Sequence, residues 1–277
     1  MAKLSPRESA QASALRGDIE AAVTRWTELQ HQGDVATQAA LAELAAFRGE
    51  WDAAMGYAST VTAAPRSINT LNVYHDMLRL VALAGVHLGC WAEVERAANA
   101  AKSASEACSF EVHASAASGL ASFAAARGEV SQGWRPGRYD DRPEAERVAR
   151  YDAAIGKLEK DRKRFKTPEA RRDHYVAIAE NCLLYEAGLS LYDKGGLPEL
   201  FDSVVFVASA LARAGRGDEA WVAVRSKLGV WWPFEDTQVV PVELLADEAL
   251  RPLMTPERCN EVLHTPRGPQ AAGVVSG

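Results

Sequence analysis

Residues that could perform acid–base, nucleophilic or metal chemistry are present in this chain, but not at the spacings that such chemistry needs. No HExxH zinc motif, no phosphate-binding glycine loop and no GxSxG nucleophile turn occurs in the 277 residues. The six histidines are isolated from one another, and the pair His75-Asp76 lies near the start of an expected helix, where a surface or capping role accounts for it. We therefore predict no catalytic residue, no metal site and no cofactor, which favours a protein that is not an enzyme.

Two charged segments come closest to the composition of a metal-binding or partner-binding site. The first joins four carboxylates to three arginines: Asp140, Asp141, Glu144 and Glu146 with Arg138, Arg142 and Arg147. This mixture is typical of a solvated segment rather than a cation site. The second is the basic run 157–166, and residues 128–175 around it carry 13 Lys or Arg against 10 Asp or Glu. Its acids are interleaved at helix-pairing spacings, which favours a solvated helix face, with docking of an acidic partner protein as the alternative.

Composition excludes several classes of function. The formal net charge of −6 argues against a nucleic-acid or membrane-surface binder, which would need a basic face. The four cysteines show no CxxC spacing, which favours a reducing compartment over a disulfide framework. No secretory signal and no run of 18 uncharged apolar residues is visible in the sequence, so we expect a cytoplasmic protein.

A short phrase recurs along the chain: a Gly, usually after Arg, followed by an acid and one or two Ala. The clearest copies are Arg16-Gly17-Asp18 and Arg48-Gly49-Glu50, and weaker ones lie around Gly89, Gly128 and Gly215. Most copies separate two Ala- and Leu-rich stretches, where one helix would stop and the next begin. A helix–turn–helix unit repeated about every 32 to 40 residues is typical of an α-solenoid, so the predicted fold class is all-α.

Helical periodicity and Gly or Pro punctuation predict the elements. Helix pairs are expected at 5–29, 34–61 and 69–104, then single helices at 105–126, at 148–165 and from Thr167 to Tyr192, and a last pair at 197–214 and 218–227. We divide the chain into a repeat domain at 1–228 with an irregular insertion at about 128–166, a C-terminal cap at 229–266 and a disordered tail at 267–277.

The second helix pair resembles the tetratricopeptide repeat, a unit of two antiparallel helices. Leu41 and Ala42 match its Leu–small pair, Gly49 its turn glycine, Trp51 its aromatic residue and Ala54 the small residue of its second helix. The other two matching units are carried by Ala82, Gly89 and Trp91, and by Ala208, Gly215 and Ala220. The resemblance implies a right-handed α-solenoid of antiparallel helix pairs.

In tetratricopeptide proteins the first helix of each pair lines the concave face, and its exposed positions select the ligand. The resemblance places nine residues there: Glu43, Asp76, Arg79, His87, Ser118, Ser122, Asp202, Ser209 and Arg213. This set is polar and mixed in charge, which suits an inserted protein segment. Three residues of the expected 133–143 loop form a second predicted partner contact: Trp134, Arg138 and Tyr139.

The stretch from Pro241-Val-Glu-Leu-Leu through Thr265-Pro-Arg-Gly268 resembles the ends of bacterial helical-repeat proteins that are encoded beside toxins. That resemblance implies an immunity protein, which binds and neutralises a cognate toxin, and an acidic protein suits a basic target such as a nuclease. Two alternatives stay open: an all-α enzyme with its site at the 133–143 loop, and a regulator that senses a peptide or small ligand. Trp231, Trp232 and Phe234 are expected to cap the last helix pair rather than to bind a partner.

Overall fold

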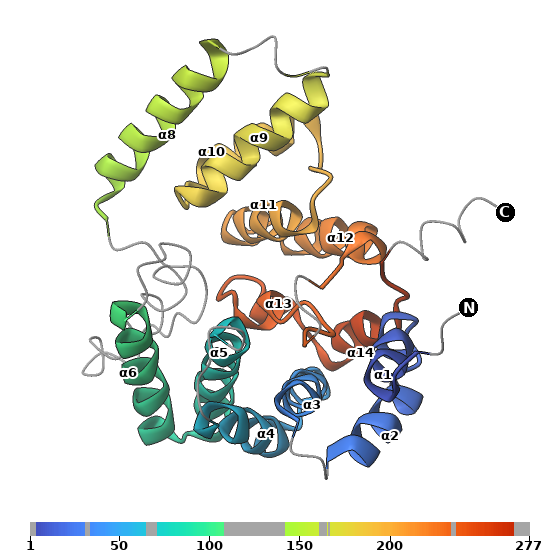
Figure 1. Cartoon of the computed structure of the whole chain (residues 1–277). Coiled ribbons are helices and arrows are strands. Elements are labelled where there is room, and N and C mark those ends of the chain that lie inside the picture. The colour runs from blue at the N-terminus through green and yellow to red at the C-terminus, as the bar shows by residue number, and fades with distance from the viewer. Residues whose placement is uncertain are drawn as a thin grey trace, which may run out of the picture. The chain divides into compact units, whose positions relative to one another are not determined.

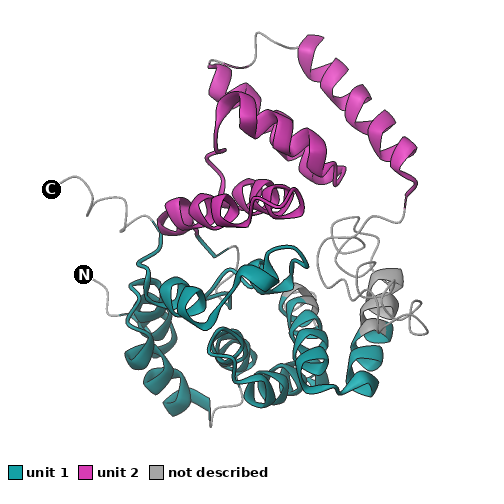
Figure 2. Ribbon diagram, turned by 180° about the vertical axis from the view of Figure 1, so that it is seen from behind, with its two compact units in different colours: residues 1–138, 232–277 teal, residues 139–231 magenta. Residues whose placement is uncertain are grey.

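The fold is described from a computed structural model, which describes residues 4–30, 34–64, 71–107, 142–160, 165, 167–233 and 237–268. Within these ranges all regular secondary structure is helical, in agreement with the predicted all-α class. None of the helices described is long and apolar enough to cross a membrane. The chain forms two compact units, one of residues 1–138 with 232–277 and one of residues 139–231 (Figure 2).

The helices agree with most of the predicted boundaries (Figure 1). Those of unit 1 are α1 (Pro6–Leu15), α2 (Ile19–Leu29), α3 (Val35–Phe47), α4 (Trp51–Ala63), α5 (Leu71–Leu88), α6 (Trp91–Ala107), α13 (Glu243–Ala246), the 3-10 turn η6 (Arg251–Leu253) and α14 (Pro256–His264). Those of unit 2 are α8 (Glu144–Lys160), α9 (Pro168–Asn181), α10 (Tyr185–Gly195), α11 (Phe201–Arg213), α12 (Gly217–Lys227) and the 3-10 turn η5 (Leu228–Val230).

Five helix pairs share one turn geometry. One or two residues past the end of the first helix, the chain has a residue with positive φ, and it is a glycine in four of the five turns: Gly17, Gly49, Gly89 and Gly215. In each turn this residue's N–H donates to a carbonyl three residues back, and the next N–H donates five residues back, as in Glu50 to Ala45 at 2.9 Å. This is the Schellman motif, which satisfies the last carbonyls of the first helix. The recurring glycine phrase is therefore confirmed as a turn at these four sites, while Gly128 lies outside the described residues.

The fifth turn corrects a prediction. A single helix was expected from Thr167 to Tyr192, but the chain turns between α9 and α10 at Leu183, which has φ +48°. Leu184 N–H donates to Ala179 O at 2.9 Å, as in the glycine turns. No Gly or Pro marks this turn in the sequence. Leu183 instead adopts the left-handed conformation that usually favours glycine.

Small residues let the paired helices approach closely, as the repeat resemblance implied. Ala42 and Ala54, the small residues of the second pair, are both fully buried. In the third pair Val94 takes the second position, and Gly85 compensates for its size: a Cβ at Gly85 would lie 2.6 Å from a Val94 methyl group. Adjacent helices therefore pack as pairs throughout both units.

Helix α3 lies at the centre of unit 1, with α4, α5 and α14 packed against it (Figure 1). Twelve of its thirteen residues are buried, because its sequence is apolar on every side apart from a few polar residues. The C-terminal segment returns to this centre. Arg267 and Gly268, expected to open a disordered tail, are buried there, and the Arg267 N–H donates to Leu15 O at 2.7 Å.

The aromatic cluster expected in the cap is split between the units. Trp231, at the end of unit 2, is buried, whereas the Trp232 side chain of unit 1 is 57 % exposed. Part of the Trp232 ring covers Gly268, where a Cβ would lie 2.4 Å from a ring carbon. Phe234 lies outside the described residues.

Candidate functional site

Three of the residues predicted for the concave face lie together in unit 1, but they contact the chain's own C-terminal segment. Glu43, on α3, is 2 % exposed, and its Oε2 accepts hydrogen bonds from the N–H groups of Val239 and Val240 at 2.7 and 3.3 Å. Burial raises the pKa of this carboxyl group well above its usual range, against the lowering effect of the two N–H donors.

The same segment binds two of the three predicted residues on α5, Asp76 and Arg79. The Gln238 side-chain amide donates to Asp76 Oδ2 at 3.1 Å. The Arg79 guanidinium lies 3.6 Å from Asp76 and 4.0 Å from Glu243. The chain's own segment 237–243, which leads into α13, therefore lies on α3 and α5 where a partner segment was expected.

Arg267 fixes this arrangement from the other side. Its Nη2 donates to Ala14 O at 3.1 Å and to Val239 O at 3.0 Å, and its Nη1 donates to Val262 O. Burial lowers the pKa of this guanidinium to about 10, and the nearby Glu43 opposes that shift. The network joins α1, α3 and the C-terminal segment into one buried polar centre.

The remaining predicted residues are dispersed. His87 is exposed at the end of α5 and stacks on the Trp51 ring with 3.9 Å between ring centroids. In unit 2, Asp202 is exposed, and the Arg213 guanidinium lies 4.2 Å from the centre of the Tyr185 ring. Ser209 is 1 % exposed, so its side chain offers no surface to a partner. The other five lie outside the described residues: Ser118, Ser122, Trp134, Arg138 and Tyr139.

Helix α8 of unit 2 carries the feature that most resembles a binding surface. It is the predicted amphipathic helix, and none of its seventeen residues is buried. Its apolar stripe is covered incompletely: Tyr151, Ile155 and Leu158 are half-buried, and the Val148 side chain is 38 % exposed. A helix with an apolar stripe normally buries that stripe against a neighbour, so α8 has apolar surface left to cover.

A single arginine anchors α8 to the α9–α10 turn. Arg147 Nη1 donates to Leu183 O at 2.8 Å and to Cys182 O at 3.4 Å. These carbonyls belong to the end of α9, where a cation is also favoured by the helix dipole. The anchor holds the first turn of α8 at the end of α9.

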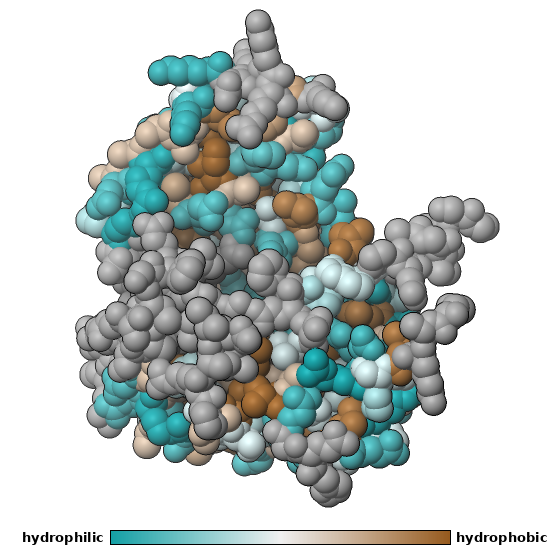
Figure 3. All heavy atoms as spheres, viewed as in Figure 1, coloured by the Kyte–Doolittle hydropathy of each residue, from teal (hydrophilic) through white to brown (hydrophobic). Residues whose placement is uncertain are grey.

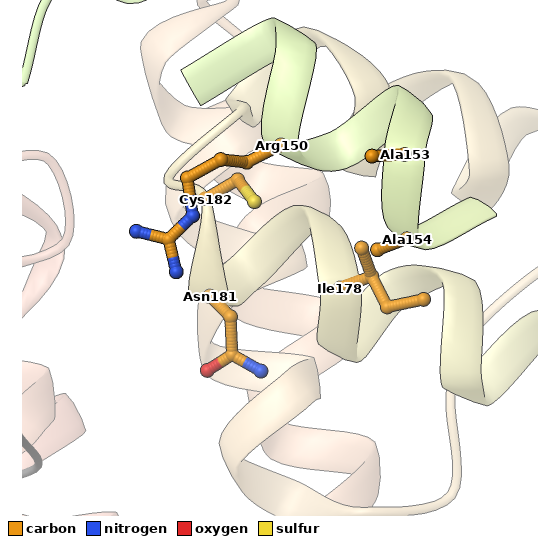
Figure 4. A pocket seen from close by; sticks show the side chains of 6 residues that line it. All are labelled: Arg150, Ala153, Ala154, Ile178, Asn181 and Cys182. Atoms are coloured by element: carbon orange, nitrogen blue, oxygen red, sulfur yellow. The ribbon is translucent and has the colours of Figure 1, made fainter. Parts of the chain in front are cut away.

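An open pocket of about 400 Å³ lies between α8 and α9 (Figure 4). The α8 wall consists of Arg150, Ala153 and Ala154, one face of that helix, and the α9 wall of Ile178, Asn181 and Cys182. Figure 4 shows Arg150, Cys182 and Asn181 towards one end of the pocket, and Ala153, Ala154 and Ile178 towards the other. Two alanines on α8 opposite a single isoleucine leave the space unfilled.

Few of the described residues are arranged for metal or nucleophilic chemistry. Among them, no group of three or more His, Cys, Asp or Glu side chains could hold a metal ion. Burial raises the pKa of the Cys259 thiol to about 11, so that thiol stays protonated at neutral pH and is a poor nucleophile. The pocket residues offer hydrogen-bond donors and apolar walls, without a paired acid and base.

Sequence reasoning missed this pocket, although part of its signal was present. Arg150, Ala153, Ala154 and Lys157 follow helical spacing, so they share one face of α8 that combines two cations with two small residues. The α9 wall could not be anticipated, because it depends on the turn at Leu183. Comparison of the chain with protein-family profiles, with curated proteins and with solved structures gives no match.

Proposed function

We propose that this chain is a non-enzymatic helical-repeat protein, a degenerate solenoid of tetratricopeptide-like pairs, which binds a partner protein at the face formed by α8 and α9. The observation that carries the proposal is the incomplete burial of α8. Its apolar stripe and the adjoining pocket leave hydrophobic surface in water, and burying such surface is the main driving force of protein association.

A protein partner fits this face better than a small molecule does. The pocket volume is within the range of about 300–1,000 Å³ found for small-molecule sites. However, Arg150, Ala153 and Asn181 are all exposed, so a small ligand would keep much of its surface in water. A partner protein can insert side chains into the pocket and cover the α8 stripe beside it. On the face shown in Figure 3 the hydrophobic residues form small patches among hydrophilic ones, as is usual for a partly polar docking surface.

Charge distribution supports a more specific version, in which the chain is a bacterial immunity protein that neutralises a cognate toxin. The sequence of unit 1 has 15 Lys or Arg against 21 Asp or Glu, whereas unit 2 has 16 of each. The whole net charge of −6 therefore belongs to unit 1. An acidic unit accelerates the encounter with a basic target such as a nuclease, while contacts on unit 2 supply specificity.

Lysine-directed cross-linking in the cells that encode the chain tests the docking face directly. Lys157 and Lys160 lie on α8, and both are exposed. We expect a partner to become cross-linked at these lysines in the wild type. Ala153→Trp, which fills the pocket, should abolish the cross-link, and Ala145→Trp should keep it because Ala145 is an exposed α8 residue outside the pocket lining. An unchanged cross-link in Ala153→Trp would refute docking at this face.

Co-expression tests the immunity version separately. The protein encoded by the neighbouring gene is produced in a host strain with and without this chain. We expect arrested growth with the neighbour alone, restored growth with the wild type or Ala145→Trp, and no restoration with Ala153→Trp. A harmless neighbour would overturn the toxin version and leave the cross-linking result to decide the broader proposal.

A further inference from the structure

One end of the α8–α9 pocket presents hydrogen-bond donors that have no partner among the described residues. The Arg150 guanidinium and the Asn181 amide are both exposed, and neither forms a hydrogen bond or ion pair within the described part of the chain. In Figure 4 both side chains extend from their helices at the same end of the pocket. A guanidinium offers two parallel N–H donors that match a carboxylate, and an amide adds a further donor.

The other end is apolar and narrow. Ala153 and Ala154 present only methyl groups, and Ile178 faces them from α9 (Figure 4). Such walls suit an aliphatic side chain, because binding there removes its CH₂ groups from water. The pocket therefore combines an anion-binding end with an aliphatic end.

The charges around the pocket are consistent with an anionic ligand. Arg150 and Lys157 lie on the same face of α8, one at the pocket and one two helical turns further along. Glu146 precedes Arg150 by one turn, but no ion pair joins the two. Across residues 128–175 the 13 Lys or Arg exceed the 10 Asp or Glu, which is the reverse of the balance in the whole chain.

We propose that the pocket receives an acidic side chain from the partner protein, with its carboxylate on Arg150 and Asn181 and a neighbouring aliphatic side chain between Ala153, Ala154 and Ile178. This inference rests on the proposed function and specifies the chemistry of the partner. Arg150 and Asn181 then determine specificity, because a partner without the carboxylate leaves the desolvated guanidinium unpaired.

Random-peptide display on the immobilised full chain tests the inference without a known partner. Peptides are selected on the wild type and depleted on Ala153→Trp, so that only pocket-dependent sequences remain. We expect these sequences to be enriched in Asp or Glu next to Leu, Ile, Val or Met. Affinities of synthetic peptides are then measured by fluorescence polarisation on the wild type and on Arg150→Gln. Because Arg150 is exposed, this variant should keep the fold, which circular dichroism checks.

Changing the peptide's acid to its amide should weaken binding roughly tenfold or more, the usual effect of removing a charge-assisted hydrogen bond. Arg150→Gln should weaken the acidic peptide by a similar factor and leave the amide peptide almost unaffected. Pocket-dependent peptides without an acidic residue would overturn the inference while supporting the docking face. If no recovered peptide depends on the pocket, the docking face itself is refuted.

Discussion

Helices α3 and α8 are opposites in how much of their surface is buried. In unit 1, α3 is enclosed on every side, and twelve of its thirteen residues are buried. In unit 2, α8 is four residues longer and has no buried residue. The difference follows from sequence: α3 is Ala- and Leu-rich around its whole circumference, whereas α8 has charged residues on most of its surface and one apolar stripe.

The two helices also differ in how they use polar groups. The carboxyl group of Glu43 on α3 accepts hydrogen bonds from the chain's own backbone, and Arg267 completes the network through Val239. Arg150 of α8 keeps its guanidinium at the edge of an open pocket. Buried polar groups must be satisfied internally, so those of α3 determine stability. Exposed groups are satisfied by water and can be exchanged for a partner, so those of α8 are suited to recognition.

Removal of Arg267 should cause the largest loss of stability, because its guanidinium satisfies buried carbonyls on three segments of unit 1. We expect Arg267→Ala to lower the free energy of unfolding by about 3–5 kcal/mol, because several buried carbonyls lose their donor at once. Urea denaturation followed by circular dichroism measures the loss, and hydrogen exchange should show it in α1 and α14.

Arg258→Ala is the matched control. The Arg258 Nη1 donates to Leu253 O at 3.0 Å, but the side chain is partly exposed. We expect a loss of about 1 kcal/mol for this variant. Equal losses for the two arginine variants would show that loss of the buried Arg267 costs no more stability than loss of the partly exposed Arg258.

A pair of glycine substitutions should give the next largest effects. Gly17 and Gly49 have nearly the same left-handed φ, +79° and +74°. A Cβ at Gly49 would meet nothing within 4 Å, so Gly49→Ala should cost about 1–2 kcal/mol through backbone strain alone. At Gly17 the Cβ would lie 2.3 Å from the His264 carbonyl oxygen, and Gly17→Ala should cost about 2–5 kcal/mol.

Thermal unfolding of both variants, measured side by side, checks this difference. If Gly17→Ala is no less stable than Gly49→Ala, α14 can move away from the α1–α2 turn without cost. The C-terminal segment would then be a loosely held addition rather than part of the core of unit 1.

These glycines also show how much of the fold could be predicted from sequence. Gly17, Gly49, Gly89 and Gly215 marked their turns because the left-handed conformation favours a residue without Cβ. The turn at Leu183 could not be recognised, because its conformation is imposed by packing rather than by residue type. Glu43 was expected at an exposed position of a concave face, whereas it is buried and bonded to Val239. Val239 lies 196 residues further along the chain, and local patterns carry no information about such pairs.

The candidate site was less predictable than the fold. The amphipathic helix from Val148 onward was expected, and its charged face was interpreted as solvated or as a dock for an acidic partner. The pocket needs a second wall, Ile178 and Asn181, whose position depends on the turn at Leu183 and on the Arg147 anchor. Both are tertiary features, so the sequence alone indicated a charged helix but not a pocket.

Replacement of Glu43 by glutamine should change the pH dependence of stability more than the stability itself. The pKa of this carboxyl group is raised in the folded state, so its folded form retains a proton that the unfolded form releases above about pH 4.5. Unit 1 should therefore lose stability as the pH rises from the unfolded pKa through the higher folded pKa. Glu43→Gln should remove this slope, because glutamine does not titrate.

Urea midpoints between pH 5 and 9 measure the slope in both proteins. Glu43→Ala serves as the control for the hydrogen bonds, because it leaves the N–H groups of Val239 and Val240 buried without this acceptor. That variant should be about 1–3 kcal/mol less stable than Glu43→Gln at every pH, because neither side chain titrates and only the acceptor differs. An unaltered slope in Glu43→Gln would assign the pH dependence to another group.

Replacement of Arg147 by alanine is expected to have the smallest effect on global stability. Its guanidinium satisfies the carbonyls of Leu183 and Cys182, as Arg267 does for carbonyls in unit 1, but the helix it holds is exposed. Arg147→Ala should cost about 1 kcal/mol, so amides of α8 should exchange roughly fivefold faster while those of α11 stay unchanged. Lys157→Ala, on the same helix and exposed, should leave both rates unaltered.

The variant also separates stability from recognition. Loosening α8 moves the Arg150, Ala153 and Ala154 wall away from α9, so a partner that uses the pocket must first restore the docked position and binds more weakly by the same factor of about five. Unchanged exchange together with weaker binding would instead place Arg147 in direct contact with the partner. Faster exchange with unchanged binding would mean that the partner contacts α8 alone and that the α9 wall of the pocket takes no part in recognition.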